Sequence, residues 1–419
     1  MVYGKFSLIK VLLLSQEFEK AVNELYKDPY FLNDAVHFGI ALSYYGVLRV
    51  VESPNSFPEA GNLVSTKHIS IQADAAFSVY YFHFTRLISK FVRKWAHTDP
   101  VDMLNYIYHI GIYGSSLDSI KMGGDDPAAI RGKEYSRFVY QAIGDILAES
   151  SLYSQMLGHI GSDSGQRIPG HVEHFRSLIH LDTEKQYLYR IVYQAAENSD
   201  KASRYQDAIH LYHLGSQYNK VVQILNRRLG DYLLQENIQQ PHTGKKDIHD
   251  VVDTNFPRVD SNPIEAAEQI LFYYQSNLST ALALDPKIVL TCSTLIKLYR
   301  FREQVNQGRD DTAVDLFYGL ALVPDSADMN ETQSKAEAFQ ELDDSVARVM
   351  PHMIMLCSKS LFSIYKSSVS AHIDSSARQN RLSKIKQRSK SLLMFVGLVE
   401  YRIPQDILAK INQYDVLMS

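Results

Sequence analysis

The chain has 419 residues, of which 45% are hydrophobic and 21% charged, and its formal net charge is only −4. This composition is typical of a folded protein rather than a disordered one, and the small negative charge argues against attraction of the whole chain to nucleic acid. Its 20 glycines and 13 prolines are too few for the turns of an all-β architecture.

Cysteine content and targeting signals narrow the class further. The two cysteines, Cys292 and Cys357, cannot form a disulfide framework in a chain of this size, which indicates a reducing compartment. The N-terminal residues lack the order of charged, apolar and small residues that makes a signal peptide. The apolar runs 8–14 and 392–399 have less than half of the ~18 residues that a membrane span needs. We therefore expect a soluble intracellular protein.

Helical periodicity dominates the sequence. Apolar residues recur at three- and four-residue spacing, which predicts helices over residues 6–26, 31–50, 71–95, 103–112, 135–147, 172–196, 205–214, 221–234, 264–283, 288–305, 346–369, 382–399 and 407–416. Strand-like alternation is almost absent, and segment 68–71 is too short to build a sheet. Loops are expected at 53–67, 122–130, 158–170, 239–261 and 323–334. The sequence therefore predicts an all-α fold.

Four prolines support this prediction, because each follows a side chain that caps helices well. The pairs are Asp99-Pro100, Asp126-Pro127, Asn262-Pro263 and Asp285-Pro286. At the first helical position the missing proline N–H costs nothing, since that donor has no partner within the helix. We expect a helix to begin at each of these prolines.

The predicted helix 71–95 is unusually rich in aromatic side chains. Its aromatic residues spread around the helix axis rather than along one stripe: Phe77, Tyr80, Tyr81, Phe82, Phe84, Phe91 and Trp95. A helix that is apolar nearly all round is usually buried on several sides. The segment is therefore predicted to be a central core helix.

A weak internal similarity favours an open stack of helices over a closed bundle. Segments 18–22, 205–209 and 218–222 share the order aromatic, polar, charged, small, β-branched. An aromatic and a small residue three positions apart lie on one helix face, where the small residue admits the neighbouring helix. Such units must stack to bury their apolar faces. Because no strict period runs through the chain, we expect an irregular solenoid.

Motifs for catalysis, cofactors or metals are not found in the sequence. The stretch around Gly132-Lys133-Glu134 lacks the first glycine and the hydroxyl of a phosphate-binding loop. The histidine pairs His171/His174 and His210/His213 have no carboxylate or cysteine at a ligand spacing. The acidic pairs 125–126, 310–311 and 343–344 lack the third aspartate that magnesium-dependent isoprenoid enzymes use. No cofactor, metal or catalytic residue is predicted.

Two charged segments stand out near the C-terminus. Residues 325–344 hold seven acids against one base, and residues 378–390 hold six bases and no acid. On a helix, four of these bases form one stripe beside Leu382, Ile385 and Leu392: Arg378, Arg381, Lys384 and Arg388. The stripe is either a solvated face, or a contact with the acidic segment, or a docking surface for an acidic partner, a phosphate backbone or a membrane surface. These four residues are the partner-binding candidates.

Four segments resemble the nucleoporin-interacting-component family, the linker scaffold nucleoporin of the inner ring of the nuclear pore. They are residues 15–26, 34–48, 99–106 and 205–214, and they occur in the order of the family. They include the runs Asp34-Ala35-Val36-His37-Phe38-Gly39 and Tyr205-Gln206-Asp207-Ala208-Ile209. Gln16-Glu17-Phe18-Glu19 departs from the usual Gly-Gln-Phe-Glu wording. The matches cover about residues 6–234.

The resemblance implies an elongated, coatomer-related α-helical solenoid whose chain can fold back on itself. Members of the family also carry an N-terminal coiled coil that recruits the central-channel nucleoporins, and no heptad run precedes Phe6 here. We therefore expect residues 1–419 to be a single solenoid, a fragment of a longer protein that does not bind the central-channel nucleoporins. No catalytic residue is implied.

The sequence thus predicts a non-enzymatic scaffold of the nuclear pore complex in the nucleus, peripheral to the nuclear envelope. Its expected partners are other inner-ring nucleoporins and short linear motifs of linker nucleoporins, without specific nucleic acid. The alternative is a coat or tethering solenoid of vesicle traffic, which would share the fold. A third hypothesis, an all-α enzyme, would need clustered acids or histidines around a cavity.

Overall fold

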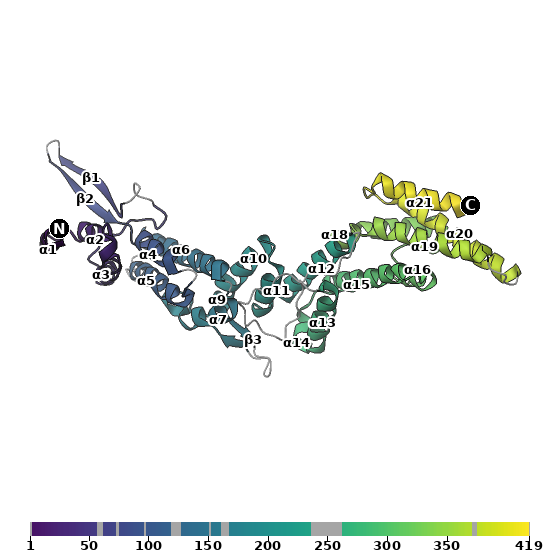
Figure 1. Ribbon diagram of the computed structural model, residues 1–419, viewed down its shortest axis with the longest axis horizontal. Helices are drawn as coiled ribbons and strands as arrows, with labels where there is room; N and C mark the ends of the chain where they lie inside the picture. The colour runs from purple at the N-terminus through teal and green to yellow at the C-terminus, as the bar shows by residue number, and fades with distance from the viewer. Residues whose placement is uncertain are drawn as a thin grey trace. The chain divides into compact units, whose positions relative to one another are not determined.

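Helices make up most of the computed structural model, which describes residues 2–56, 62–72, 75–95, 98–118, 127–150, 152–160, 167–235, 262–370 and 375–418 (Figure 1). The described residues fall into two compact units, one up to Gly215 and the other from Ser216 onward. None of the helices in the described part is long and apolar enough to cross a membrane. That the whole chain forms a single continuous solenoid stays a prediction.

Unit 1 consists of helices of varied length, one long and one short hairpin, and several single turns. Its elements are α1 (Val2–Leu14), α2 (Phe18–Tyr26), η1 (Pro29–Phe31), α3 (Leu32–Tyr44), β1 (Val64–Gln72), β2 (Ala75–Phe82), α4 (Phe84–Val92), η2 (Arg93–Trp95), α5 (Pro100–Asp118), α6 (Pro127–Ser150), α7 (Tyr153–Leu157), β3 (Gly158–Ile160), β4 (Arg167–Pro169), α8 (His171–His174), η3 (Arg176–Ile179), α9 (Glu184–Tyr187), η4 (Leu188–Val192), α10 (Tyr193–Lys201) and α11 (Tyr205–Leu214). Neighbours along the chain pack together, as α2 does with α3, α5 with α6 and α10 with α11.

The regular elements among the described residues of unit 2 are all helices. It contains α12 (Tyr218–Leu234), α13 (Pro263–Ser276), α14 (Leu278–Ala283), α15 (Pro286–Asn306), α16 (Asp310–Tyr318), α17 (Met329–Gln340), α18 (Asp344–Ala347), α19 (Met350–Ser370), α20 (Ser375–Leu398) and α21 (Gln405–Met418). Here α15 packs on α12 and α16, and α19 packs on α16, α20 and α21. Its largest fully buried side chains are aromatic: Tyr274, Phe301, Phe317 and Phe395.

The proline-marked helix starts are confirmed. Helices α5, α6, α13 and α15 begin at Pro100, Pro127, Pro263 and Pro286. The Asn262 side chain accepts hydrogen bonds from the N–H groups of Ile264 and Glu265, and Asp285 accepts one from Lys287 at 2.9 Å. The small residues of the similar segments 18–22 and 205–209 were expected to face a neighbouring helix. In agreement with this, Ala21 and Ala208 are fully buried.

The prediction of one core helix over residues 71–95 is wrong, and so is the statement that segment 68–71 is too short for a sheet. Strands β1 and β2 form an antiparallel hairpin in which Val64 lies opposite Phe82 and Lys67 opposite Val79. The last five residues of β2 are Ser-Val-Tyr-Tyr-Phe, and β-branched and aromatic residues favour strands. Of the predicted helix, α4 and the single turn η2 remain, and Trp95 is 38% exposed.

Other boundaries also differ from the prediction. The predicted loop 158–170 contains the paired strands β3 and β4, and the loops 53–67, 122–130 and 323–334 include the first residues of β1, α6 and α17. The predicted helix 6–26 breaks at Gln16, whose φ is +62°, and 172–196 breaks at His180, whose φ is +61°. A left-handed residue cannot continue an α-helix. Loop 239–261 lies outside the described residues.

Candidate docking surface

The basic stripe predicted from the sequence lies on α20, largely on the side of the helix that packs. Ile385, Leu392 and Phe395 are buried, and α20 contacts α17, α19 and α21. Residues at three- and four-residue steps share a face, so Arg381 and Arg388 point toward this packed side. Their charges are therefore available to acids of neighbouring elements in unit 2.

Arg388 is the most enclosed of the four candidates, with its side chain only 12% exposed. Its Nε donates to Asp325 Oδ1 at 2.6 Å, and its Nη1 lies 3.8 Å from Asp315 Oδ1. The guanidinium also lies 4.2 Å from the centre of the Tyr318 ring, where a cation–π contact stabilises the charge. Arg388 thus joins α20 to α16 and to the first residue of the acidic segment 325–344.

The other three candidates are held less firmly. Arg381 Nη2 donates to Asp311 Oδ1 at 2.5 Å, with the arginine side chain 44% exposed. Arg378 Nη2 donates to the carbonyl of Val369 at 2.5 Å. Lys384 is exposed and has no partner within the described part of the chain, and the same holds for Lys390. The structure therefore divides the stripe into three arginines with partners and one lysine, Lys384, without one among the described residues.

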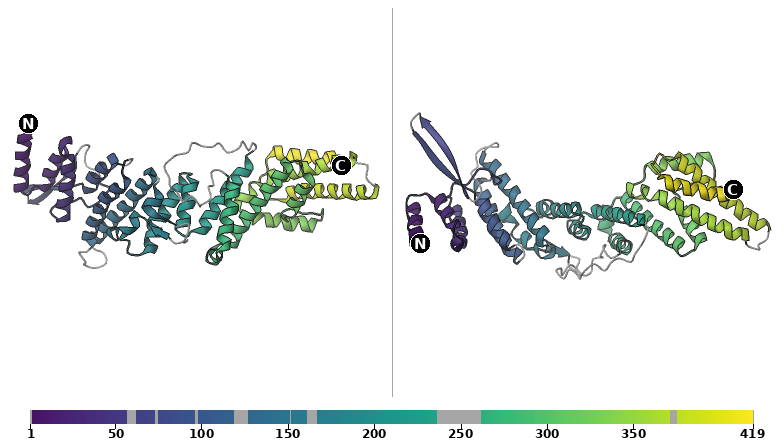
Figure 2. Two further views of the ribbon diagram at one scale, coloured as in Figure 1. Left: turned by 60° about the horizontal axis from the view of Figure 1, so that its bottom comes forward. Right: turned by 45° about the horizontal axis from the view of Figure 1, so that its top comes forward.

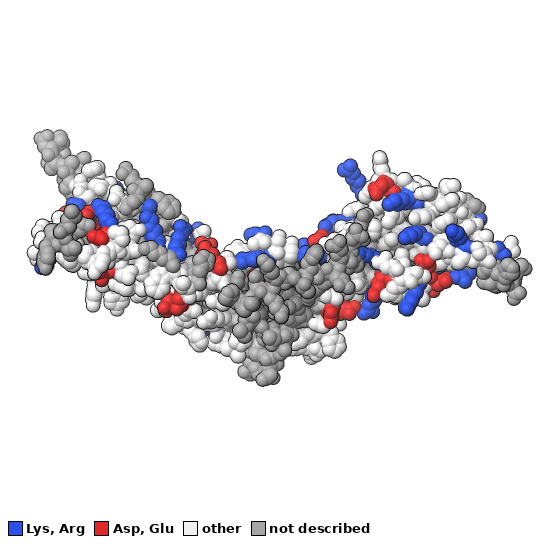
Figure 3. All heavy atoms as spheres, viewed as in Figure 1, with Lys and Arg blue, Asp and Glu red and all other residues white. Residues whose placement is uncertain are grey.

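Two acids of the segment 325–344 cap the starts of helices. Asp328 accepts from Asn330 N–H at the start of α17, and Asp343 accepts from Ser345 N–H at 2.9 Å at the start of α18. Glu331 accepts hydrogen bonds from the Ser326 hydroxyl and the Asp325 N–H, which lower its pKa. Figure 3 shows acids and bases interspersed over the visible face of unit 2 rather than a field of one sign.

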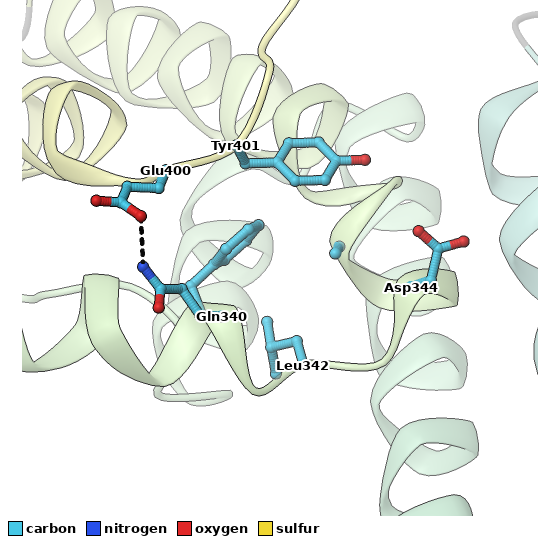
Figure 4. A pocket seen from close by; sticks show the side chains of 7 residues that line it. Gln340, Leu342, Asp344, Glu400 and Tyr401 are labelled. Atoms are coloured by element: carbon cyan, nitrogen blue, oxygen red, sulfur yellow. Dashed lines mark hydrogen bonds between the residues drawn. The ribbon is translucent and has the colours of Figure 1, made fainter.

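A pocket of about 290 Å³ opens where the end of α17, the start of α18 and the segment between α20 and α21 meet (Figure 4). Its apolar wall consists of Phe339, Leu342 and Ala347, and its polar rim carries Asp344 and Glu400. Gln340 Nε2 donates to Glu400 Oε2 at 3.2 Å, and the rings of Phe339 and Tyr401 meet edge to face at 5.7 Å. Sequence analysis missed this pocket, because its walls come from segments about 60 residues apart.

Of the histidines and cysteines singled out in the sequence, His210, His213, Cys292 and Cys357 are buried, whereas His174 is exposed. His171 and Phe175 have ring centres 4.9 Å apart, and burial lowers the pKa of His213 to about 4. Burial raises the pKa of the Cys292 thiol to about 12 and that of Cys357 above its ordinary range. Among the described residues, three or more histidine, cysteine or acidic side chains nowhere gather as metal ligands do.

The structure by itself indicates the class of protein, and comparison with known proteins then shows the family. Helices that pack mainly on their neighbours along the chain are typical of an α-helical solenoid. Comparison with known proteins is more specific: the chain belongs to the Nup93/Nic96 family, whose model matches residues 4–410. The resemblance stated from four short segments is therefore confirmed over nearly the whole chain.

The relatives and the solved structures agree with this assignment. The chain is 26% identical to the meiotically up-regulated gene 87 protein of Schizosaccharomyces pombe, over 98% of this chain and 44% of that protein. It is 24% identical to the nuclear pore complex protein Nup93 of Danio rerio, over 99% of this chain and 44% of that protein. A crystal structure of Chaetomium thermophilum Nic96 SOL superimposes with a TM-score of 0.68 and 24% identity, covering 97% of this chain and 55% of that one.

These comparisons confirm the predicted helical solenoid fold and the family. The family is one of nucleoporins rather than enzymes, so the expectation of a non-enzymatic protein is confirmed as well. The vesicle-coat alternative finds no support in them. The chain spans less than half the length of these curated relatives.

Proposed function

We propose that this chain is a structural scaffold of the inner ring of the nuclear pore complex and works at the nuclear envelope. The observation that carries the proposal is the family match over residues 4–410. Two relatives are named as pore proteins, the nucleoporin NIC96 of Saccharomyces cerevisiae and Nup93 of Danio rerio. A stack of helices offers long surfaces that hold partners at fixed separations, so the mechanism is steric and adhesive.

The proposed partners are other inner-ring nucleoporins, including short linear motifs of linker nucleoporins, and no specific nucleic acid. Apolar grooves between adjacent helices suit partner helices or extended segments. The central-channel nucleoporins are not expected to bind this segment, because by resemblance a separate coiled-coil region recruits them. The chain is expected to be peripheral to the envelope, holding on through these protein contacts.

The first test is affinity purification of the tagged chain from nuclear-envelope extract, with mass spectrometry of the proteins that elute with it. Recovery of inner-ring nucleoporins without the central-channel set is the expected result. Recovery of vesicle-coat subunits would leave the fold standing and overturn the proposed location. A fluorescent tag on the same chain should label the nuclear rim as separate spots.

We also propose that the exposed cations of α20 contribute to docking. Lys384 and Lys390 are exposed without partners among the described residues, whereas Arg381 and Arg388 already pair with Asp311 and Asp325. The double variant Lys384→Glu/Lys390→Glu should therefore reduce partner recovery without disturbing the helix. The matched control is Lys359→Glu on α19, an exposed lysine outside the stripe. Equal recovery with both variants would remove the docking role.

A further inference from the structure

The hairpin of β1 and β2 is the one large sheet feature among the described residues, and it extends away from the helices of unit 1 (Figures 1 and 2). It is fixed at its base. Glu19 of α2 accepts a hydrogen bond from the Arg49 N–H at 2.8 Å, and Asn23 accepts one from the Leu63 N–H at 3.0 Å. Both of these α2 side chains are buried. The anchoring is therefore built into the core of unit 1.

The hydrogen bonds at the base fix which backbone groups of the hairpin face outward. His83 N–H donates to the Leu63 carbonyl at 2.8 Å, so this carbonyl points toward the other strand. Inward and outward groups alternate along antiparallel strands. The N–H and C=O groups of Val64, Thr66 and His68 therefore point away from β2. We call these groups the β1 edge.

The two edges of the hairpin are not equivalent. On β2 the outward groups of Phe82 are already used, because its N–H donates to Arg49 at 2.7 Å and its carbonyl accepts from Val51 at 3.1 Å. The Lys20 amine of α2 lies 3.7 Å from the centre of the Tyr80 ring on the same strand. Among the described residues, nothing pairs with the β1 edge, and Thr66 and His68 are exposed.

We propose that the β1 edge binds an extended segment of another protein, which adds to the hairpin as a third strand. A row of unpaired N–H and C=O groups recognises an extended backbone. The two-stranded hairpin, marginal alone, gains stability from a third strand. Lys67 is exposed without an ion partner among the described residues, and oppositely charged neighbours stabilise a strand pair. The bound segment carries an acidic residue beside Lys67.

A second copy of this chain fits the edge less well than another protein does. Antiparallel pairing of two β1 edges centred near Thr66 or His68 places both Lys67 side chains on one face, within a few residues of each other. Like charges so close destabilise strand pairing. The inference goes beyond the proposed function, since it does not depend on where the chain works.

The test uses the purified full chain and a phage-displayed library of random decapeptides, with the enriched peptides resynthesised and their binding measured by fluorescence anisotropy. Thr66→Pro removes an outward N–H, and proline is tolerated at such edge positions. Its matched control is Ser78→Pro, which removes an outward N–H from the β2 edge instead. Circular dichroism checks that both variants keep the helices of the parent chain.

The expected result is a set of acid-containing, strand-forming peptides whose binding falls about tenfold or more with Thr66→Pro, and within twofold of the parent with Ser78→Pro. Lys67→Glu should also weaken them. The proposal is overturned if no peptide is enriched, which would leave Lys67 as a guard against aggregation. It is also overturned if both prolines act alike, or if sedimentation shows a dimer that Thr66→Pro dissolves. None of these failures would bear on the proposed location at the pore.

Discussion

Arg302 of α15 caps the end of α12 through its guanidinium, whose Nη1 donates to the carbonyl of Leu233 at 2.6 Å. The Arg302 side chain is buried, and burial lowers its pKa. The last four carbonyls of a helix lack partners within the helix, and a cation is favourable there because of the helix dipole. One buried side chain thus holds together two helices that are about 70 residues apart in the sequence.

Replacing this arginine should destabilise unit 2. Arg302→Met keeps most of the side-chain volume but leaves the carbonyl unpaired, and hydrogen bonds to charged groups contribute about 1.5–3 kcal/mol. We expect the melting temperature to fall by several degrees, measured by circular dichroism. The control is Arg300→Met, because Arg300 is 61% exposed and its ion pair among the described residues is with Glu268 alone. An equal fall in melting temperature for the two variants would show that the helix cap stabilises unit 2 no more than an exposed ion pair does.

Arg388 and Lys384 lie on one helix and should differ sharply in their effect on stability. Arg388→Ala removes the ion pairs with Asp325 and Asp315 and the contact with the Tyr318 ring, so we expect a loss of about 2 kcal/mol. Lys384→Ala, at an exposed position, should change the free energy of unfolding by less than about 0.5 kcal/mol.

The measurement is urea unfolding followed by circular dichroism, and Arg388→Lys should recover only part of the loss, since lysine lacks the planar fork. If Arg388→Ala is as stable as the parent, the contacts of Arg388 do not stabilise unit 2, and Arg388 is available for docking. The comparison also sets the design of docking experiments: a charge reversal that includes Arg388 would confound binding with stability.

Gly158 is required by its backbone and its surroundings. It has φ +96°, and a Cβ placed on it would lie 2.2 Å from the Ile168 carbonyl oxygen. Gly158→Ala should therefore break the β3–β4 pairing and cost more than about 3 kcal/mol. Gly46 has φ +68° but open space around it, so Gly46→Ala should cost only about 1–2 kcal/mol. Thermal unfolding of the two variants separates the steric clash from the backbone strain.

Helical periodicity predicted the fold class because most helices of this chain bury a regular apolar stripe. The periodicity gave the wrong secondary structure at residues 71–82. There, Val79 to Phe82 form a short apolar run that is equally compatible with a buried helix and with a strand. In the structure, the buried partners Glu19 and Asn23 hold the base of the hairpin. They lie about 30 to 40 residues away from the residues they bind, so no local sequence pattern predicts these contacts.

For the basic stripe, the sequence showed the residues but not their partners. Its spacing on one helix face was visible in the sequence, together with Ile385 and Leu392 beside it. Those apolar neighbours are buried, so they were the sign that this side of α20 packs inward. The acids that receive Arg381 and Arg388 lie 63 to 73 residues away, and such pairing follows from tertiary structure alone. The same holds for the pocket between Phe339 and Tyr401.

His213 should make the stability of unit 1 depend on pH. Burial, with a smaller effect of the neighbouring His210, lowers the pKa of His213 to about 4, against an ordinary value of 6.5. Between these values the unfolded chain binds a proton that the folded chain does not, so stability falls as the pH falls from 6.5 to 4. The full effect is on the order of 3 kcal/mol.

Urea unfolding of the parent chain and of His213→Leu, compared at pH 7, 6, 5 and 4, measures this contribution directly. The difference in unfolding free energy between the two proteins should shift in favour of His213→Leu as the pH falls, whatever its value at pH 7. The control is His174→Leu, because His174 is exposed at the surface of the same unit. A difference that stays constant from pH 7 to 4 would mean that His213 takes up its proton in the folded chain as readily as in the unfolded one. Its burial would then carry no electrostatic cost.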